Sequence, residues 1–286
     1  RHDIHQYPEL SNREFRTSKK DAEHLKTIGL EVETEVAHTG VVGLLKGGLP
    51  GPIVAIRADM DALPVIEKTG LSYASQVKTT YLGNEVGVMH ACGHDAHVAI
   101  LMGVAEFFAQ HKEQIKGSIV FIFQPAEEGP PEGENGGAKM MLEEGLFEKY
   151  PVESVFGMHN IPGMPVGSFA VKPGPIMAAF DIFNVKIIGK GGHAAMPQTT
   201  IDPIIIGTKV IDAYQSIVSR FIDPQDPVVL SVTQFHGGDA YNVIPNEIEI
   251  KGCTRCFSPK VQNQLEKQMR QITESICAAY DANFEF

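Results

Sequence analysis

The first part of the chain alternates helical patterns with short apolar runs. Residues 11–29 form a polar, helix-like segment that ends at Gly29, and residues 95–111 carry apolar positions at helical spacing. Short apolar runs at 52–58, 118–123 and 152–158 predict three strands, and residues 138–144 are predicted to form a short helix. Strands that alternate with helices predict an α/β fold with a mostly parallel sheet covered on both faces.

From about Lys172 the order of the elements changes. Proline at the first helical position, after Asp202 and again after Ser258, marks the start of two helices. The predicted elements are a strand at 180–188, a helix from Asp202, strands at 228–235 and 246–257, and a helix from Ser258 to about Tyr280. This β-α-β-β-α order predicts a smaller α+β domain with one helical face. We therefore expect two domains, residues 1–171 and 172–286.

Charge and composition exclude several classes of protein. The 286 residues include 24 Lys and Arg against 35 Asp and Glu, a net charge of −11. This balance argues against nucleic-acid binding and against attachment to an anionic membrane. No apolar run reaches the roughly 20 residues of a membrane-spanning helix. The four cysteines are too few for a disulfide scaffold. Cys253 and Cys256 lie three apart on a predicted strand, where they face opposite sides, so we expect them to be packing residues.

Candidate metal ligands are densest just before the predicted helix at 95–111. Cys92 and His94 flank Gly93, so a tight turn could direct both side chains at one point. The partial positive charge of a helix N-terminus favours a thiolate, and thiolate with imidazole suits zinc or a similar metal. A helix-capping turn with a buried cysteine would leave the same pattern.

Acidic residues and a histidine follow the predicted strands. Strand 118–123 runs into Glu127 and Glu128, and ligands bind at the carboxyl ends of strands in parallel sheets. Adjacent carboxylates cannot both face one metal, so one would coordinate it while the other acts as the general base of a hydrolysis. Two more strands end in residues of ligand type, namely Asp59, Asp61 and His159. Together these strand ends favour a metal site over a solvated acidic loop.

Seven motifs in order carry a family resemblance. They are RHDIHQYPELSNREF, RADMDALP, MHACGHDAH, IFQPAEEG, GMHN, GKGGHAAMPQTTIDP and NVIPNEI. The chain resembles the N-acyl-amino-acid amidohydrolases, which include hippurate hydrolases and plant indole-acetyl-amino-acid hydrolases; aminoacylases and succinyl-diaminopimelate desuccinylase are more distant. The resemblance implies a zinc-peptidase-like catalytic domain over 1–171 and a lid domain over 172–286 that pairs two chains as a homodimer.

The resemblance also implies a metal-dependent hydrolysis of the amide bond of N-acyl amino acids. The cofactors would be two divalent ions, manganese or zinc. Glu127 matches the general base, Asp61 matches a residue that orients a ligand, and Asp59 has no settled role. The implied metal ligands are Cys92, His94, Glu128 and His159.

Three residues of the second domain match substrate-binding positions. His193, in a Gly-Gly-His turn, matches a residue that reaches across from the partner subunit to the carbonyl oxygen of the substrate. Arg255 is the candidate anchor for the substrate carboxylate, because a guanidinium binds carboxylate through two parallel hydrogen bonds. Asn242, thirteen residues earlier, would assist it.

The chain departs from the family pattern at its end. Relatives return to the catalytic domain and donate one more histidine, whereas every histidine here precedes Cys253. We therefore expect a truncated chain that lacks the last metal ligand. Open alternatives are a dipeptidase of the same fold, a non-catalytic dimerising fragment, and a thiol enzyme with Cys92 as nucleophile and His94 as base. A thiolate ligand is compatible with the reducing cytoplasm, which is the expected location.

Overall fold

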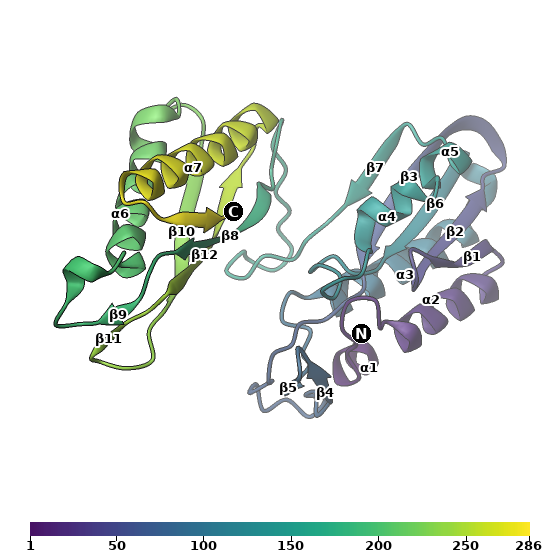
Figure 1. Ribbon diagram of the computed structural model, residues 1–286. Coiled ribbons are helices and arrows are strands. Elements are labelled where there is room, and N and C mark those ends of the chain that lie inside the picture. The colour runs from purple at the N-terminus through teal and green to yellow at the C-terminus, as the bar shows by residue number, and fades with distance from the viewer. The chain divides into compact units, whose positions relative to one another are not determined.

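The computed structural model describes residues 1–286. The chain divides into two compact units, unit 1 from Arg1 to Val166 and unit 2 from Gly167 to Phe286 (Figure 1). Every helix is too short or too polar to cross a lipid bilayer.

Unit 1 is built on one five-stranded sheet. From edge to edge its strands are β1 (Glu31–Val36), β2 (Gly40–Lys46), β6 (Lys116–Gln124), β3 (Leu49–Asp59) and β7 (Ser154–Gly157). β2 pairs antiparallel with both neighbours, while β3 pairs parallel with β6 and β7. Four of the five strands therefore run in the same direction, which confirms the predicted mostly parallel sheet. The antiparallel β1–β2 pair was not predicted.

Helices cover both faces of this sheet, as expected. The helices of unit 1 are α1 (His2–Gln6), α2 (Phe15–Thr27), α3 (His94–Gln110), α4 (Gly137–Glu143) and α5 (Leu146–Lys149). Successive residues of a strand face opposite sides. Phe121 and Phe123 of β6 accordingly pack with Leu25 of α2 and Val98 of α3, while Val120 joins a second core with α4 and α5. Both sides of β6 are therefore buried.

Unit 1 also contains a short 3-10 turn and a small hairpin. A short 3-10 turn (Lys112–Gln114) precedes β6, and a two-stranded hairpin joins β4 (Lys78–Tyr81) to β5 (Asn84–Gly87). Leu82 and Gly83 form its turn with φ of 49° and 78°. Positive φ at both central residues is typical of the tight turn that matches the twist of a hairpin.

Unit 2 has the predicted α+β composition. Its antiparallel sheet runs in the order β10 (Val228–His236), β12 (Glu247–Cys256), β8 (Ala179–Ile188) and β13 (Asn283–Glu285). Helices α6 (Pro203–Ser216) and α7 (Pro259–Ala279) pack together with one face of the sheet in a single core. The Asp202 side chain caps α6 by accepting a hydrogen bond from the Ile204 amide at 2.9 Å, as the sequence indicates.

Short elements complete unit 2. They are β9 (Gly192–His193), a 3-10 turn (Pro197–Thr199), a π-helical turn (Ile217–Phe221) and β11 (Val243–Ile244). β9 and β11 pair in a separate two-stranded sheet (Figure 1). In β12, Cys256 is buried and Cys253 is half-buried, and both are free thiols.

Candidate metal centre

The carboxyl ends of the parallel strands of unit 1 carry the predicted ligands. β3 ends at Asp59, β6 is followed by Glu127 and Glu128, β7 is followed by His159, and α3 begins at His94. These segments come together because β3 pairs with both β6 and β7 and so brings their carboxyl ends to one edge.

His94 lies at the centre of the cluster. Its Nδ1 lies 2.8 Å from the carbonyl oxygen of Asp61. Since a carbonyl only accepts hydrogen bonds, Nδ1 carries the hydrogen and Nε2 has a free lone pair. That Nε2 is buried without a hydrogen-bond partner, 3.7 Å from Glu127 Oε2 and 3.9 Å from Glu128 Oε1. A buried, unpartnered lone pair among carboxylates is the arrangement that a cation satisfies.

His159 repeats this pattern. Its Nδ1 donates to the carbonyl oxygen of Asn160 at 2.7 Å, which leaves the lone pair of Nε2 directed at Cys92 Sγ, 3.3 Å away. Metal-bound histidines usually donate their second ring N–H in this way, because the bond fixes the ring and its tautomer. Cys92, His94 and His159 place one ligand atom each within 4.8 Å of one another, and so do His94, Glu127 and Glu128.

His97 differs from the other two histidines. Its Nδ1 lies 2.6 Å from Asp59 Oδ1, and its Nε2 accepts a hydrogen bond from the Asn160 amide at 3.1 Å. His97 lies in a third cluster of ligand-type groups, with His94 and Asp59. Because both of its ring nitrogens already have protein partners, His97 positions its neighbours. Sequence reasoning assigned no role to His97 or Asn160, although both stand in the MHACGHDAH and GMHN motifs.

Asp59 is held from two sides. Besides His97, the guanidinium of Arg57 donates to its Oδ2 at 2.7 Å, and His94 Nε2 lies 3.6 Å from the same oxygen. Burial raises the pKa of Asp59, but the hydrogen bond from His97 and the charge of Arg57 outweigh it and leave that pKa well below its usual value. Asp59 is therefore a fixed negative charge beside the cluster, and Arg57 is a supporting residue that the sequence did not reveal.

Asp61 links three parts of the site. Its Oδ2 accepts hydrogen bonds from Ser11 Oγ at 2.7 Å and from the Glu128 amide at 2.9 Å, and its Oδ1 lies 3.3 Å from His94 Nδ1. Asp61 therefore orients both a histidine and the loop that carries Glu128. Ser11 lies 50 residues away in the sequence, and no local pattern pointed to it.

Glu14 fixes the loop before the paired glutamates. Ala126 has a φ of +48°, a left-handed conformation that is rare for an alanine, and its amide donates to Glu14 Oε1 at 2.9 Å. The other oxygen of Glu14 accepts from Thr39 Oγ1 at 2.6 Å. Burial raises the pKa of Glu14 to about 6 despite these bonds. Glu14 is a second supporting residue that sequence reasoning missed.

The electrostatics of the cluster correct one expectation. We expected the helix N-terminus to favour a Cys92 thiolate. Instead, burial together with the carboxylates of Glu128 and Glu127 raises the pKa of Cys92 to about 12. The negative charges outweigh the helix dipole, so a bound cation is needed to deprotonate this thiol. This chemistry disfavours a thiol nucleophile and fits a metal ligand.

Burial and neighbouring charges also shift the pKa values of His94 and Glu127. Burial lowers the pKa of His94, but its hydrogen bond with Asp61 and the nearby carboxylates outweigh that effect, and the pKa of His94 is raised. Burial raises the pKa of Glu127, and the negative charges of Asp59 and Glu128 add to it. A raised carboxylate pKa is typical of a general base that works near neutral pH. The donor set of sulfur, imidazole and carboxylate fits a divalent transition metal.

The predicted residues of unit 2 fall into two places. His193 in β9 pairs with Val243 in β11, and the Ala194 amide donates to the Asn242 carbonyl at 3.0 Å, so His193 and Asn242 are neighbours. Arg255 lies near the C-terminal end of β12, whereas β11 precedes its N-terminal end. The guanidinium of Arg255 stacks on the Phe180 ring, with its central carbon 4.0 Å from the ring centroid.

The length of β12 sets the separation of these two places. From Glu247, which follows β11, to Arg255 the strand spans about 27 Å. Asn242, which lies beside β9 and β11 before the start of β12, and Arg255, near the end of β12, are therefore far apart within one chain.

Comparisons with known proteins identify the family of the chain. The family model described as peptidase family M20/M25/M40 matches residues 55–284. Thermostable carboxypeptidase 1 of Saccharolobus solfataricus is 46% identical over 286 residues, which cover all of this chain and 70% of that protein. An N-acyl-L-amino acid amidohydrolase of Geobacillus stearothermophilus is 43% identical over all of this chain and 74% of its own length.

A solved structure supports the same assignment. The YXEP protein of Bacillus subtilis, a dinuclear metal-binding peptidase of the M20 family, is 38% identical with a TM-score of 0.78, over 99% of this chain and 70% of that one. The expected resemblance to N-acyl-amino-acid amidohydrolases is confirmed. The chain therefore belongs to peptidase family M20/M25/M40 and is a metal-dependent hydrolase of amide bonds.

Proposed function

We propose that this protein hydrolyses N-acyl amino acids to a carboxylic acid and a free amino acid, with two divalent ions, manganese or zinc, at the cluster around His94. The observation that carries the proposal is the convergence of four predicted ligands, Cys92, His94, Glu128 and His159, beside a second glutamate, Glu127. The relatives named as an N-acyl-L-amino acid amidohydrolase and a hippurate hydrolase, at 43% and 42% identity, favour this substrate class.

In the proposed mechanism, Glu127 moves the proton. A divalent ion supplies Lewis acidity at the cluster, which lowers the pKa of a water and polarises the substrate carbonyl. Glu127 takes a proton from the attacking water and passes it to the nitrogen of the leaving amino acid. Its carboxylate lies 3.7 Å from His94 Nε2, and its raised pKa suits both steps. Asp61 and Asp59 hold His94 and the Glu128 loop in place.

The substrate is held by unit 2 in this proposal. Arg255 binds the carboxylate of the amino acid, and His193 with Asn242 donates to the carbonyl oxygen, where negative charge develops. β12 spans about 27 Å from Glu247 to Arg255, and Asn242 lies outside it, beside β9 and β11. One substrate therefore cannot contact both Arg255 and Asn242 in a single chain. We infer a homodimer in which His193 and Asn242 serve the partner's centre.

Unit 2 offers an edge for such a dimer. β10 is a terminal strand of the sheet, so one side of its backbone is unpaired, and Val229 and Phe235 on it are exposed.

We propose that residues 1–171 are the catalytic domain and residues 172–286 the lid and dimerisation domain. The free state of all four cysteines supports a reducing compartment, the cytoplasm.

Mixed dimers test this function. Purified protein with manganese or zinc should hydrolyse N-acyl amino acids, whereas Glu127→Gln and His193→Ala homodimers should each be inactive. If His193 acts across subunits, half of the randomly mixed dimers contain one intact centre, so the mixture should recover about a quarter of the wild-type rate. No recovery would show that His193 acts within its own subunit. A metal-loaded protein inactive on every N-acyl amino acid would contradict the proposed function itself.

A further inference from the structure

A second cluster of ionisable side chains lies beside the first turn of α3. His5 of α1 stands between two carboxylates: its Nδ1 lies 3.0 Å from Asp95 Oδ2, and its Nε2 lies 3.2 Å from Glu67 Oε1. All three side chains are buried, with 6% or less of each exposed. The mechanism proposed above uses none of them. These three residues, Asp95, His5 and Glu67, are named the His5 bridge.

The two contacts fix the charge of His5. A carboxylate oxygen accepts hydrogen bonds, so each ring nitrogen carries a hydrogen, and a ring with two N–H groups is the imidazolium cation. Burial raises the pKa of Glu67, but hydrogen bonds outweigh burial and lower that pKa, so Glu67 is an anion. The donors are Thr69 Oγ1, the Ser75 amide and His5. His5 is therefore a buried cation between anions, and removing it alone leaves buried negative charge without a partner.

One end of the His5 bridge holds the helix that binds the metal. Asp95 follows His94 directly in the first turn of α3, and its Oδ2 also accepts a hydrogen bond from Arg1 Nε at 2.9 Å. Because successive residues of a helix point about 100° apart, holding the Asp95 side chain also fixes the direction in which His94 points. A rotation of about 10° moves an atom about 5–6 Å from the helix axis by about 1 Å. Metal–ligand distances tolerate a deviation of only about 0.2 Å.

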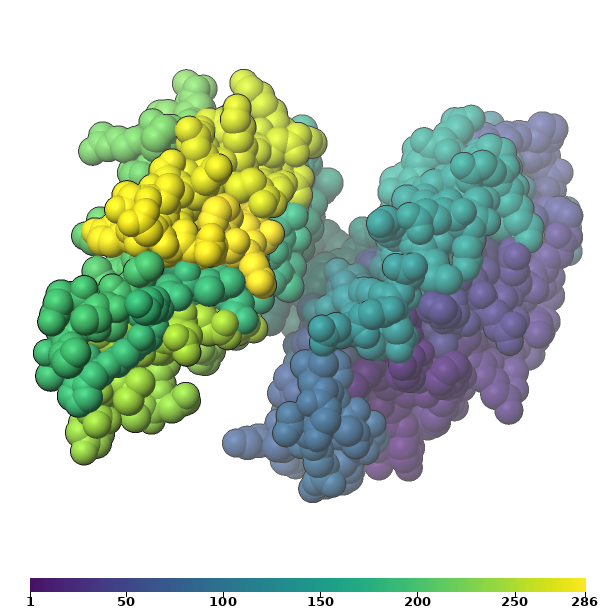
Figure 2. Space-filling model, viewed as in Figure 1, coloured from purple at the N-terminus to yellow at the C-terminus, as the bar shows by residue number.

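The other end of the His5 bridge holds the largely exposed loop of residues 64–77. The Glu67 carboxylate gathers this loop, since it accepts hydrogen bonds from Thr69 Oγ1 and, at 2.6 Å, from the Ser75 amide. The ring of His2 stacks on that of Tyr73, with the centroids 3.8 Å apart. In Figure 2 the blue atoms of this part of the chain lie beside the purple atoms of the N-terminal segment. The loop is therefore attached to α1.

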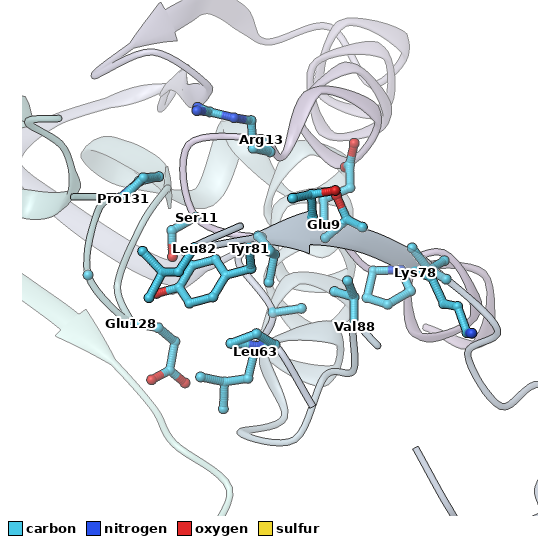
Figure 3. Close-up of a pocket in the computed structure, with 18 of the residues that line it drawn as sticks. Glu9, Ser11, Arg13, Leu63, Lys78, Tyr81, Leu82, Val88, Glu128 and Pro131 are labelled. Carbon is cyan, nitrogen blue, oxygen red and sulfur yellow. The ribbon is translucent and has the colours of Figure 1, made fainter. Parts of the chain in front are cut away.

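The two ends of this loop border the metal centre. Pro64 and Val77 line a cavity of about 740 Å³ whose wall also includes Glu128, one of the predicted ligands (Figure 3). The His5 bridge therefore connects the turn that carries His94 with the segment that lies beside Glu128. Displacing His5 releases both.

We propose that His5 is a positioning residue of the metal centre: its imidazolium holds the first turn of α3, and with it His94, against the loop of residues 64–77. His5 makes no hydrogen bond with a predicted ligand or with Glu127, so its effect passes through Asp95. The inference goes beyond the proposed function, because it concerns how the metal ligands are held and does not depend on the substrate.

Zinc affinity tests the proposal without any measurement of turnover. His5→Gln keeps a side-chain donor but removes the positive charge, so one of the two carboxylates loses its partner. Replacing a group that orients a metal ligand lowers metal affinity by about 10–100-fold. His5 acts one contact further out, so we expect the affinity for zinc in a competitive titration to fall by about tenfold. An unchanged affinity would overturn the proposal.

The matched control is His24→Gln. His24 of α2 also ties α3 to another helix, because its Nε2 lies 3.1 Å from the carbonyl oxygen of Met102. Met102 lies about two helical turns beyond His94, so His24→Gln should lower Tm and leave zinc affinity unchanged. Equal losses of zinc affinity in the two variants would show that His5 contributes only to stability, and would overturn the proposal.

Hydrogen exchange in the unsubstituted protein provides a test that does not depend on the folding of a variant. If the His5 bridge raises zinc affinity about tenfold, zinc must stabilise the bridge by the same factor, because coupling between two sites is reciprocal. The Ser75 amide, which donates to Glu67, should therefore exchange about tenfold more slowly when zinc is bound. His5→Gln should abolish this slowing. Exchange of the Ser75 amide at the same rate with and without zinc in the wild type would overturn the proposal.

Discussion

Replacing Gly93 by alanine should disturb both the stability of the protein and its metal site. Gly93 lies between Cys92 and His94 with a φ of +93°, a conformation that costs an L-residue about 1–2 kcal/mol. A Cβ built there would lie within 2.7 Å of three side-chain atoms of Asn160, far inside the normal contact distance of about 3.5 Å. Asn160 must therefore move, at about 0.5–1.5 kcal/mol for a distorted side chain.

These terms set the expected size of the effect. Together they predict that Gly93→Ala lowers the free energy of unfolding by about 2–3 kcal/mol, a fall of roughly 4–10 °C in Tm. The carbonyl of Asn160 accepts the hydrogen bond that orients His159, so its movement also turns a metal ligand. Loss of such a supporting contact lowers metal affinity by about 10–100-fold.

The control lies in the same helix. Gly103 is exposed on α3, and a Cβ there would meet no atom within 4 Å. Gly103→Ala should therefore raise stability by about 0.8–1 kcal/mol through helix propensity alone, and metal affinity should not change. Thermal unfolding and competitive metal titration measure both quantities. If the two variants shifted Tm in the same direction, or if Gly93→Ala bound metal normally, the turn described here would be wrong.

Three further substitutions or treatments probe individual groups of the site. Glu127→Gln should reduce turnover by about 10²–10⁴-fold with unchanged metal content by elemental analysis; loss of metal would exchange the roles of Glu127 and Glu128. The raised pKa of Glu14, about 6, means that its stability contribution is present below the unfolded value and lost as pH rises through 6. Between pH 4 and pH 7, the free energy of unfolding of Glu14→Gln should therefore rise by about 2 kcal/mol relative to that of the wild type, as measured by denaturant titration. A difference between the two proteins that does not change with pH would contradict the raised pKa. In metal-free protein at pH 8, about one Cys92 thiol in ten thousand is ionised, so alkylation followed by mass spectrometry should be very slow, whereas rapid alkylation would favour a thiol nucleophile.

The sequence predicted the elements that bury continuous apolar runs or show clear helical spacing. The strand at 118–123 and the helix at 95–111 correspond closely to β6 and α3, because β6 is buried on both faces and α3 carries a core-facing stripe. The β1–β2 pair was missed because β1 is half-exposed at the sheet edge and reads as a polar segment.

The same physical distinction applies to the site. Residues whose chemistry is visible in a motif, such as Cys92 and His94, could be predicted and lie together in the structure. Ser11, Glu14 and Arg57 act through hydrogen bonds to residues distant in the sequence or to a residue two positions along the same strand, and no local periodicity records such a contact. The dependence of Cys92 on surrounding carboxylates likewise requires knowledge of three-dimensional distances.

The contacts of Ser11 and Glu14 have a consequence for how the protein is handled. They connect the first residues of the chain to Asp61 and Ala126, while Cys92 and His159 join at the same edge, so the centre ties together segments spread over most of unit 1. Ions that bind only the folded centre hold these segments in place. At a concentration 1,000 times Kd, they raise the free energy of unfolding by about 4 kcal/mol. Purification in chelating buffers should therefore yield protein that is more easily cleaved by proteases in unit 1 than metal-loaded protein.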